Sequence, residues 1–187
     1  MPSLNRVVMN RTSVKWLTAL DLPNMDVAEI SGHWGRRLKD AKTYRRFRYP
    51  EYDICAGPYL DKRKDPHQFD LILANQIWEH LDRPFLATCH IHDMLKEGGW
   101  FWLAVPFFIP FHAAPVDCSR WSARGLTNLL IEAGFAEDNI RAGQWGNRAA
   151  AQGNFEPDWP PEYRPESDTL ENEEDFPICA WAMAQKR

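Results

Sequence analysis

The chain alternates short apolar runs with segments in which apolar residues recur every third or fourth position. Short apolar runs bounded by glycine, proline or polar residues are typical of buried strands, whereas the longer spacing is typical of amphipathic helices. We therefore predict strands over residues 25–30, 43–49, 52–55, 69–74, 100–105, 140–142 and 178–184. We predict helices over residues 11–21, 35–42, 84–96 and 122–133.

Strands and helices thus follow one another along most of the chain. This order predicts an α/β domain with a largely parallel sheet, because parallel strands need a crossover segment between them. The length of 187 residues suits one domain, so we take residues 1–187 as a single unit. Residues 146–175 break the alternation. They are rich in proline and acidic residues, and we predict an irregular insertion before the last strand.

Charge is distributed unevenly along the chain. The formal net charge is −4, and residues 151–187 contain nine acidic and three basic residues. Residues 36–48 contain seven basic residues and one acidic residue, Asp40. Such a basic run suggests contacts with nucleic acid phosphates, but the chain is acidic overall and no base-stacking motif accompanies the run. Nucleic acid is therefore the weaker expectation for a partner.

The lengths of the apolar runs and the spacing of the cysteines indicate the cellular compartment. No stretch approaches the length of about 18 apolar residues that a membrane span needs, and no signal peptide precedes the first helix, so we expect a cytoplasmic protein. The four cysteines are widely spaced and form no CxxC pair, which indicates neither a zinc site nor a disulfide framework.

His90 and His92 are two residues apart on a predicted helix and point to different faces. We expect no metal site.

Polar and aromatic residues gather where the predicted strands end. Residues 29–35 follow the first strand, Asp53 the third, residues 75–80 the fourth and residues 106–120 the fifth. In an open α/β sheet, ligands bind beyond the carboxyl ends of the strands. The sequence therefore predicts a binding site at this edge of the sheet.

The stretch FDLILANQIWEHLDRPFLATCHIHDMLKEGGWFWLAVPF, residues 69–107, resembles the second half of a class I S-adenosylmethionine-dependent methyltransferase. The motifs HxxPxDxxRW and SxxGLxxLLxxAGF over residues 112–135 are similar to small-molecule members of that family. The resemblance implies a Rossmann-like, doubly wound, mostly parallel seven-stranded sheet with helices on both faces. It also implies S-adenosylmethionine as cofactor and in-line methyl transfer to an oxygen, nitrogen or carbon atom of a small-molecule acceptor. Such a reaction needs the protein mainly to position donor and acceptor.

The loop after the first strand departs from the family pattern ExGxGxG. Glu29 and Gly35 match, Ser31 and His33 replace glycines, and Gly32 is left as the close-approach glycine. The acid expected after the second strand is missing, while the acid after the third strand resembles the family's adenine contact. The cofactor-binding residues implied by the resemblance are Glu29, Ser31, Gly32, Gly35, Asp53, Asn75 and Gln76.

Catalytic and substrate-binding candidates lie beyond the fourth and fifth strands. We expect His80, His112 and Asp117 at the acceptor mouth, where a base is needed only if the acceptor atom still carries a proton. The plain structural alternatives are a hydrogen-bonding hinge for His80, a salt bridge from Arg120 that pins the loop, and burial of the Trp78 ring in the core. The residues expected to contact substrate are Trp78, Arg120 and Trp145.

Three functions remain open at this point. A small-molecule methyltransferase is favoured. A methyltransferase-like binding or scaffold protein without transfer activity is supported by the altered glycine loop and the missing acid. A nucleic-acid methyltransferase is weakened because Asn-Gln-Ile-Trp occupies residues 75–78, where base-modifying enzymes carry Asn/Asp-Pro-Pro-aromatic. The chain is short for the fold, so the pocket is expected to be open or to be completed by a second subunit in a homodimer.

Overall fold

One mixed sheet organises the part of the chain that the computed structural model describes, residues 2–113 and 115–187. Its six strands have the order β2-β1-β3-β4-β6-β5. Neighbouring strands among β2, β1, β3 and β4 run parallel, whereas β6 is antiparallel to both β4 and β5. The strands are β1 (Asp26–Ile30), β2 (Thr43–Phe47), β3 (Phe69–Asn75), β4 (Leu95–Pro106), β5 (Ile140–Trp145) and β6 (Cys179–Gln185).

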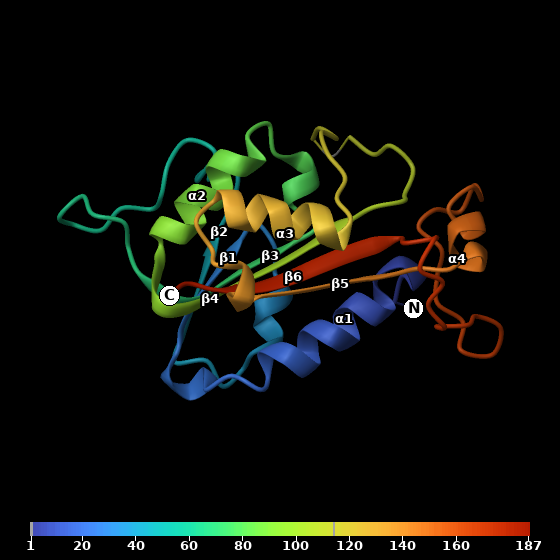
Figure 1. Cartoon of the computed structure of the whole chain (residues 1–187), viewed down its shortest axis with the longest axis horizontal. Coiled ribbons are helices and arrows are strands. Elements are labelled where there is room, and N and C mark those ends of the chain that lie inside the picture. Colours follow the sequence, from blue (N-terminus) through green and yellow to red (C-terminus); the bar gives the residue numbers. More distant parts are fainter. Residues whose placement is uncertain (1, 114) are drawn as a thin grey trace.

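Helices cover both faces of this sheet, as predicted. Figure 1 shows α2 (Pro84–Asp93) and α3 (Ala123–Glu132) on one face and α1 (Leu4–Leu17) on the other. The α2–α3 face buries residues such as Ile72 and Leu103, and the α1 face buries Leu71 and Trp102. Alternate residues of β3 therefore enter different cores, which explains why this strand is a continuous apolar run.

The prediction of seven strands is wrong, because the segment expected as a strand over residues 52–55 is a turn. The Asp53 carboxylate accepts a hydrogen bond from the Cys55 backbone N–H (2.9 Å), and the Ala56 N–H donates to the Asp53 carbonyl (3.0 Å). An aspartate that bonds to the backbone two residues ahead favours a turn over a strand. The described chain therefore passes from β2 to β3 without forming a further strand of the sheet.

The N-terminal helix, predicted over residues 11–21, begins earlier and ends earlier as α1. Asn5 and Ser13 lie on its buried face, so the apolar period that would reveal the helix is interrupted. Its first turn is held by the insertion, because the Leu4 N–H donates to the Pro161 carbonyl (2.8 Å). A contact with a residue so distant in sequence cannot be predicted from a local pattern.

Two further helix predictions are only partly right. The segment predicted as a helix over residues 35–42 forms a single 3₁₀ turn, η2 (Trp34–Arg37), because the chain must return to pair β2 with β1. The helix predicted over residues 84–96 ends at Asp93, and Leu95 already pairs with Phe69 as the start of β4. Gly98, with φ of +79°, lies in the irregular part of β4 and does not end the helix.

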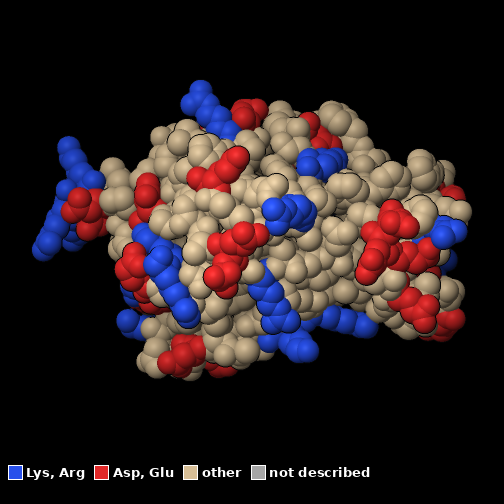
Figure 2. Space-filling model, in the orientation of Figure 1, with Lys and Arg blue, Asp and Glu red and all other residues tan. Residues whose placement is uncertain are grey.

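The acidic insertion lies between β5 and β6 and contains one short helix, α4 (Arg148–Gly153). The Asn147 side chain caps α4 by accepting a hydrogen bond from the Ala150 N–H (2.8 Å), and Arg148 pairs with Glu173 (2.9 Å). Figure 2 shows acidic side chains gathered at the end of the molecule that carries α4, while acids and bases are interspersed elsewhere on this face. None of the described helices is both long enough and apolar enough to cross a bilayer.

Candidate functional site

A cavity of about 430 Å³ lies beyond the carboxyl ends of β1, β2 and β3, at the edge where the sequence predicts a site. This volume is in the range of small-molecule sites. Its apolar walls belong to the α2–α3 core, and its polar groups come from the loops that follow the strands. The lining residues are Ile30, Ser31, Tyr49, Tyr52, Asp53, Ile54, Cys55, Ile77, His80, Leu81, Asp82, Pro115 and Val116.

Ser31 places the loop after β1 against this cavity. Its φ of +54° is in the left-handed region that favours glycine, the residue that the family pattern has at this position. The Ser31 N–H donates to the Phe47 carbonyl (2.6 Å), and the Arg46 guanidinium donates to the Ser31 carbonyl (3.0 Å). Two contacts with β2 thus hold a serine in a conformation that it adopts at a cost.

Glu29 lies behind the loop and does not line the cavity. Its fully buried carboxylate accepts hydrogen bonds from the backbone N–H groups of Trp34 and Gly35 (both 2.7 Å) and from the Tyr44 hydroxyl. A Cβ atom at Gly32 would lie 2.1 Å from Glu29 Oε1, and one at Gly35 would lie 2.5 Å from the Tyr44 ring. The two glycines are therefore required by close packing around Glu29. These three residues, which are predicted to bind cofactor, set the shape of the loop and are absent from the cavity lining.

The other predicted cofactor residues divide between two sides of the sheet. Asp53 lines the cavity. Asn75 accepts a hydrogen bond from the Trp102 indole N–H (2.9 Å), and its side-chain nitrogen is buried without a partner among the described residues. The Gln76 amide reaches the sulfur of Met9 on α1 (3.8 Å). Asn75 and Gln76 are thus absent from the cavity lining and lie toward α1.

His80 and His112, both predicted to lie at an acceptor site, form a pair of side chains in contact. Their ring centroids are 5.0 Å apart in an edge-to-face arrangement, and the His112 ring also contacts the Trp159 ring (5.4 Å). His80 Nδ1 lies 2.5 Å from the Val116 carbonyl oxygen, which ties His80 to the loop after β4. Burial lowers the pKa of His112, so its imidazole is held in the neutral form that can accept a proton.

Asp117 and Arg120 hold the loop that carries His112. The Asp117 carboxylate accepts two hydrogen bonds from the Arg120 guanidinium, one of 2.6 Å, and a third from the His112 backbone N–H (2.8 Å). The Arg120 guanidinium lowers the pKa of Asp117 to about 2. Both residues therefore hold the loop in place through this ion pair.

Trp78 and Trp145 do not lie at the mouth where the sequence predicts them. Trp78 is fully buried beside Phe101, and its indole N–H donates to the Thr88 hydroxyl (2.9 Å). Trp145 is buried in the α1-face core, and its indole N–H donates to the Leu170 carbonyl (3.0 Å). Neither ring lines the cavity. Each is buried in the core, where burial of its large apolar area stabilises the fold.

Sequence reasoning passed over Glu79, which lies directly before His80. Its side chain is fully buried, and burial raises its pKa to about 8. Glu79 Oε1 is 3.9 Å from His80 Nε2. The sequence shows an acid next to His80, which is a possible sign of a functional residue. The local pattern does not, however, distinguish a buried carboxylate from a solvated one.

A second cavity of about 480 Å³ is linked to the histidine pair through Trp159. Its walls come from the loop after β4 and from the insertion, and they include Trp159, whose ring contacts His112. His80 thus lines the first cavity, and His112 contacts a wall residue of the second. The residues that line this one are Phe108, Ile109, Pro110, Asn154, Phe155, Glu156 and Trp159.

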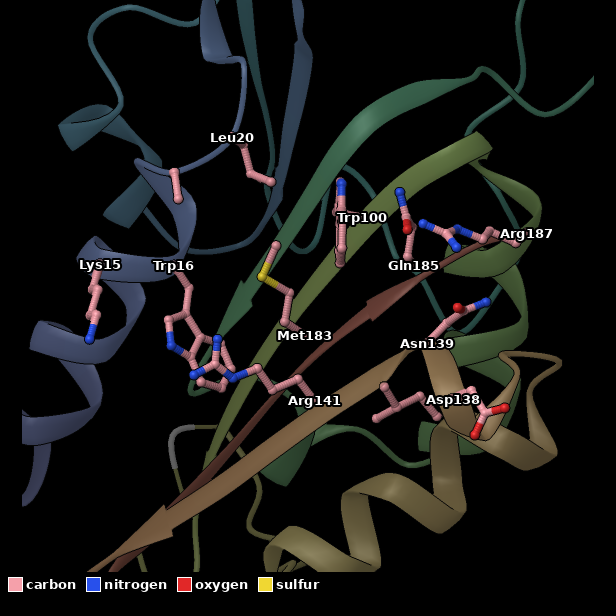
Figure 3. Close-up of a pocket in the computed structure, with 12 residues that line it drawn as sticks. Lys15, Trp16, Leu20, Trp100, Asp138, Asn139, Arg141, Met183, Gln185 and Arg187 are labelled. Carbon is pink, nitrogen blue, oxygen red and sulfur yellow. The ribbon is translucent and has the colours of Figure 1, made fainter.

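A third cavity, of about 520 Å³, lies at the opposite edge of the sheet. Figure 3 shows Trp16 of α1 beside Arg141 of β5, whose guanidinium carbon is 3.9 Å from the Trp16 ring centroid. Trp100 and Ile140 place this cavity at the amino ends of β4 and β5. It is therefore remote from the histidine pair.

The structure is similar to those of several known methyltransferases. A possible histamine N-methyltransferase from Thermotoga maritima, described as dependent on S-adenosylmethionine, gives a TM-score of 0.63 at 16% identity, over 96% of this chain and 89% of that chain. An S-adenosylmethionine-dependent methyltransferase from Mesorhizobium loti gives 0.60 at 15% identity, over 97% and 98%. A phosphoethanolamine N-methyltransferase 2 from Haemonchus contortus, in complex with phosphomonomethylethanolamine and S-adenosylhomocysteine, gives 0.61 at 10% identity, over 96% and 52%. By sequence, no family model and no curated protein matches the chain.

This chain has the fold of the S-adenosylmethionine-dependent methyltransferases. The Rossmann-like, doubly wound architecture expected from the resemblance is confirmed, with six strands in the described chain in place of seven. Within this methyltransferase fold, the cavity lined by Ser31 and Asp53 occupies the carboxyl edge of the parallel strands. That is the edge at which open α/β sheets bind ligands.

The Glu29→Gln substitution tests the buried support of the loop after β1. The amide has one acceptor oxygen, and its NH₂ group would face an N–H or hydroxyl donor, so we expect the free energy of unfolding to fall by about 2–3 kcal/mol. Urea denaturation measures the change, with the exposed Glu51→Gln as matched control. Equal stability of the two variants would show that the loop does not depend on the carboxylate.

The Asp117→Asn substitution tests the ion pair that holds the His112 loop. Because the pKa of Asp117 in the folded protein is below its ordinary value of 3.8, the carboxylate stabilises the fold above about pH 4, and this contribution is lost as the pH falls toward 2. We expect the variant to lose about 2 kcal/mol at pH 7 and clearly less at pH 3. Urea unfolding at both pH values measures this, with the exposed Asp138→Asn as control. A loss that is the same at both pH values would contradict the assignment.

Proposed function

We propose that this protein is an S-adenosylmethionine-dependent methyltransferase that acts on a small-molecule acceptor. The observation that carries the proposal is that the paired histidines connect two cavities: His80 lines the first, and His112 contacts Trp159, which lines the second. One cavity lies at the edge of the sheet where this fold binds ligands, and the other is walled by aromatic rings of the insertion. Donor and acceptor in the two cavities would meet at the histidine pair.

The residues of the first cavity suit the cofactor. The rings and aliphatic side chains of Tyr52, Ile54 and Leu81 offer apolar walls to an adenine ring, and the carboxylate of Asp53 can accept hydrogen bonds from its amine or from ribose hydroxyls. Asp82 adds a second carboxylate that favours a cationic ligand. When bound, S-adenosylmethionine supplies a methyl group on a positively charged sulfur. Glu29, Gly32 and Gly35 shape the loop that would face it.

The acceptor would occupy the second cavity. Phe155 and Trp159 supply apolar and stacking surface there, and His112 can take a proton from an acceptor oxygen or nitrogen. Asp117 and Arg120 keep His112 in place. Since two of the structural neighbours are described as N-methyltransferases, an amine is the first acceptor class to test.

A methyltransferase-like binding protein without transfer activity is the alternative that a specific observation favours. Gly32 and Gly35 are packed against Glu29, and β2 is followed by Arg48 and Tyr49, where the family carries an acid. Cofactor titration separates this alternative from the enzyme. For nucleic acid, the basic run offers less support than the sequence suggests, because Arg45 donates to the Tyr59 hydroxyl and Arg46 to the Ser31 carbonyl.

Calorimetric titration with S-adenosylmethionine and S-adenosylhomocysteine tests the cofactor assignment. We expect both to bind the wild-type protein, and Asp53→Ala to weaken binding by at least about tenfold through loss of a charged hydrogen-bond acceptor. The exposed Asp138→Ala, at the opposite edge of the sheet, is the matched control. The proposal is contradicted if neither compound binds the wild-type protein at about millimolar concentration, which corresponds to a binding free energy of roughly −4 kcal/mol.

The His112→Ala substitution tests the division of the site into two cavities. Because His112 faces the acceptor side, we expect the variant to bind S-adenosylmethionine with wild-type affinity and to lose turnover by about 10²-fold or more. Methyl transfer to a panel of small amines, followed by mass spectrometry, gives the turnover. Loss of cofactor affinity with retained turnover would mean that the two cavities have been assigned in the wrong order.

A further inference from the structure

Glu79 is a buried carboxylate without a donor. Its side chain is fully buried, and neither carboxylate oxygen accepts a hydrogen bond from another described residue. The guanidinium of Arg120 is hydrogen-bonded to Asp117 and makes no hydrogen bond with Glu79. Buried carboxylates in proteins are paired with a charge, bound to a metal or protonated. Among the described residues its one ion-pair partner is His80, whose Nε2 is 3.9 Å from Glu79 Oε1.

His80 is oriented with a free lone pair toward this carboxylate. A carbonyl oxygen can only accept a hydrogen bond, so the 2.5 Å contact with the Val116 carbonyl assigns the proton to His80 Nδ1. Nε2 then carries the lone pair, and it is the nitrogen that faces Glu79. Histidines that bind metals are commonly oriented by such a bond from the other ring nitrogen to a backbone carbonyl.

His112 completes the cluster from a different loop. Its Nε2 is buried and has no hydrogen-bond partner among the described residues. The three side chains each offer one ligand atom, and these atoms all lie within 4.8 Å of one another. The cluster therefore combines a buried carboxylate, an oriented imidazole and a buried imidazole nitrogen without a partner.

We propose that Glu79, His80 and His112 bind a divalent transition-metal ion, with Zn²⁺ as the first candidate. Two imidazole nitrogens and one carboxylate oxygen form a common three-residue ligand set for such ions. Bonds of about 2.0–2.2 Å place ligand atoms roughly 3.3 Å apart in a tetrahedral site, so ligand atoms that now lie within 4.8 Å of one another would need to approach by up to about 1.5 Å. Three protein ligands leave one coordination position open. His80 lines the first cavity, so this position would be reachable from the site.

Metal binding and general-base catalysis would compete for the same lone pair on His112. An imidazole nitrogen that binds a metal cannot accept a proton, so His112 would reach an acceptor through the metal and not as a base. The metal assignment nonetheless stands apart from methyl transfer, since it depends on no cofactor. The test therefore measures metal binding without S-adenosylmethionine.

The experiment is a calorimetric titration of chelator-treated, dialysed protein with Zn²⁺ and, separately, with Co²⁺. We expect one ion per chain, and for Co²⁺ a visible d–d spectrum of a low-coordinate site containing nitrogen and oxygen ligands. Glu79→Gln and His112→Ala should each weaken binding by at least about 100-fold, equivalent to about 2.8 kcal/mol. The exposed Glu132→Gln and His33→Ala, matched in residue type and outside the cluster, should bind as the wild type does.

Circular dichroism and thermal unfolding establish that each variant is folded, and His112→Ala keeps the test valid if Glu79→Gln fails to fold. Zn²⁺ should raise the melting temperature of the wild-type protein but not of the two cluster variants. The proposal is overturned if the wild type binds neither ion, or if both cluster variants bind with wild-type affinity through other groups such as the exposed Cys118. Failure of S-adenosylmethionine to bind would leave these measurements unaffected, so the two proposals fail separately.

Discussion

The buried carboxylate of Glu29 is the constraint on which the loop beside the first cavity depends. A charge without contact with water is costly unless donors surround it, and here Trp34, Gly35 and Tyr44 supply them. These bonds join the end of β1, the η2 turn and the edge strand β2. They also leave no room for a side chain at Gly32. The loop that faces the first cavity is therefore shaped by a buried network behind it.

Two further carboxylates, Asp117 and Glu79, lie near the histidine pair and differ in their hydrogen bonding. Asp117 is a carboxylate with its donors in place, and it holds the loop that brings His112 to His80. Glu79, a short distance away, is a carboxylate whose donors are missing. Asp117 is ionised and has its donors within the protein, whereas burial raises the pKa of Glu79 to about 8 and its oxygens have no donor among the described residues. This contrast separates a group that positions the loop from the group that we propose as a metal ligand.

Prediction from the sequence succeeded where local pattern and tertiary environment agree. β3 is apolar at nearly every position because both of its faces are covered, and α3 begins where Ser122 caps it by accepting from the Gly125 N–H (3.2 Å). It failed where the two conflict. Asn5 is buried on α1 by a hydrogen bond to Asn154 (2.7 Å), a residue of the distant insertion, so the helix lacks a clean apolar face.

The sequence by itself determined an α/β sheet with its site at the carboxyl edge, because alternating strands and helices place the residues after each strand at one edge. It correctly brought Ser31, Asp53 and His80 to that edge. Only the tertiary structure decided that Trp78 belongs to the core. It alone also decided that Glu79 is buried beside His112, which lies 33 positions away along the chain. Burial and lone-pair direction depend on what packs around a side chain, and no local pattern of residues encodes them.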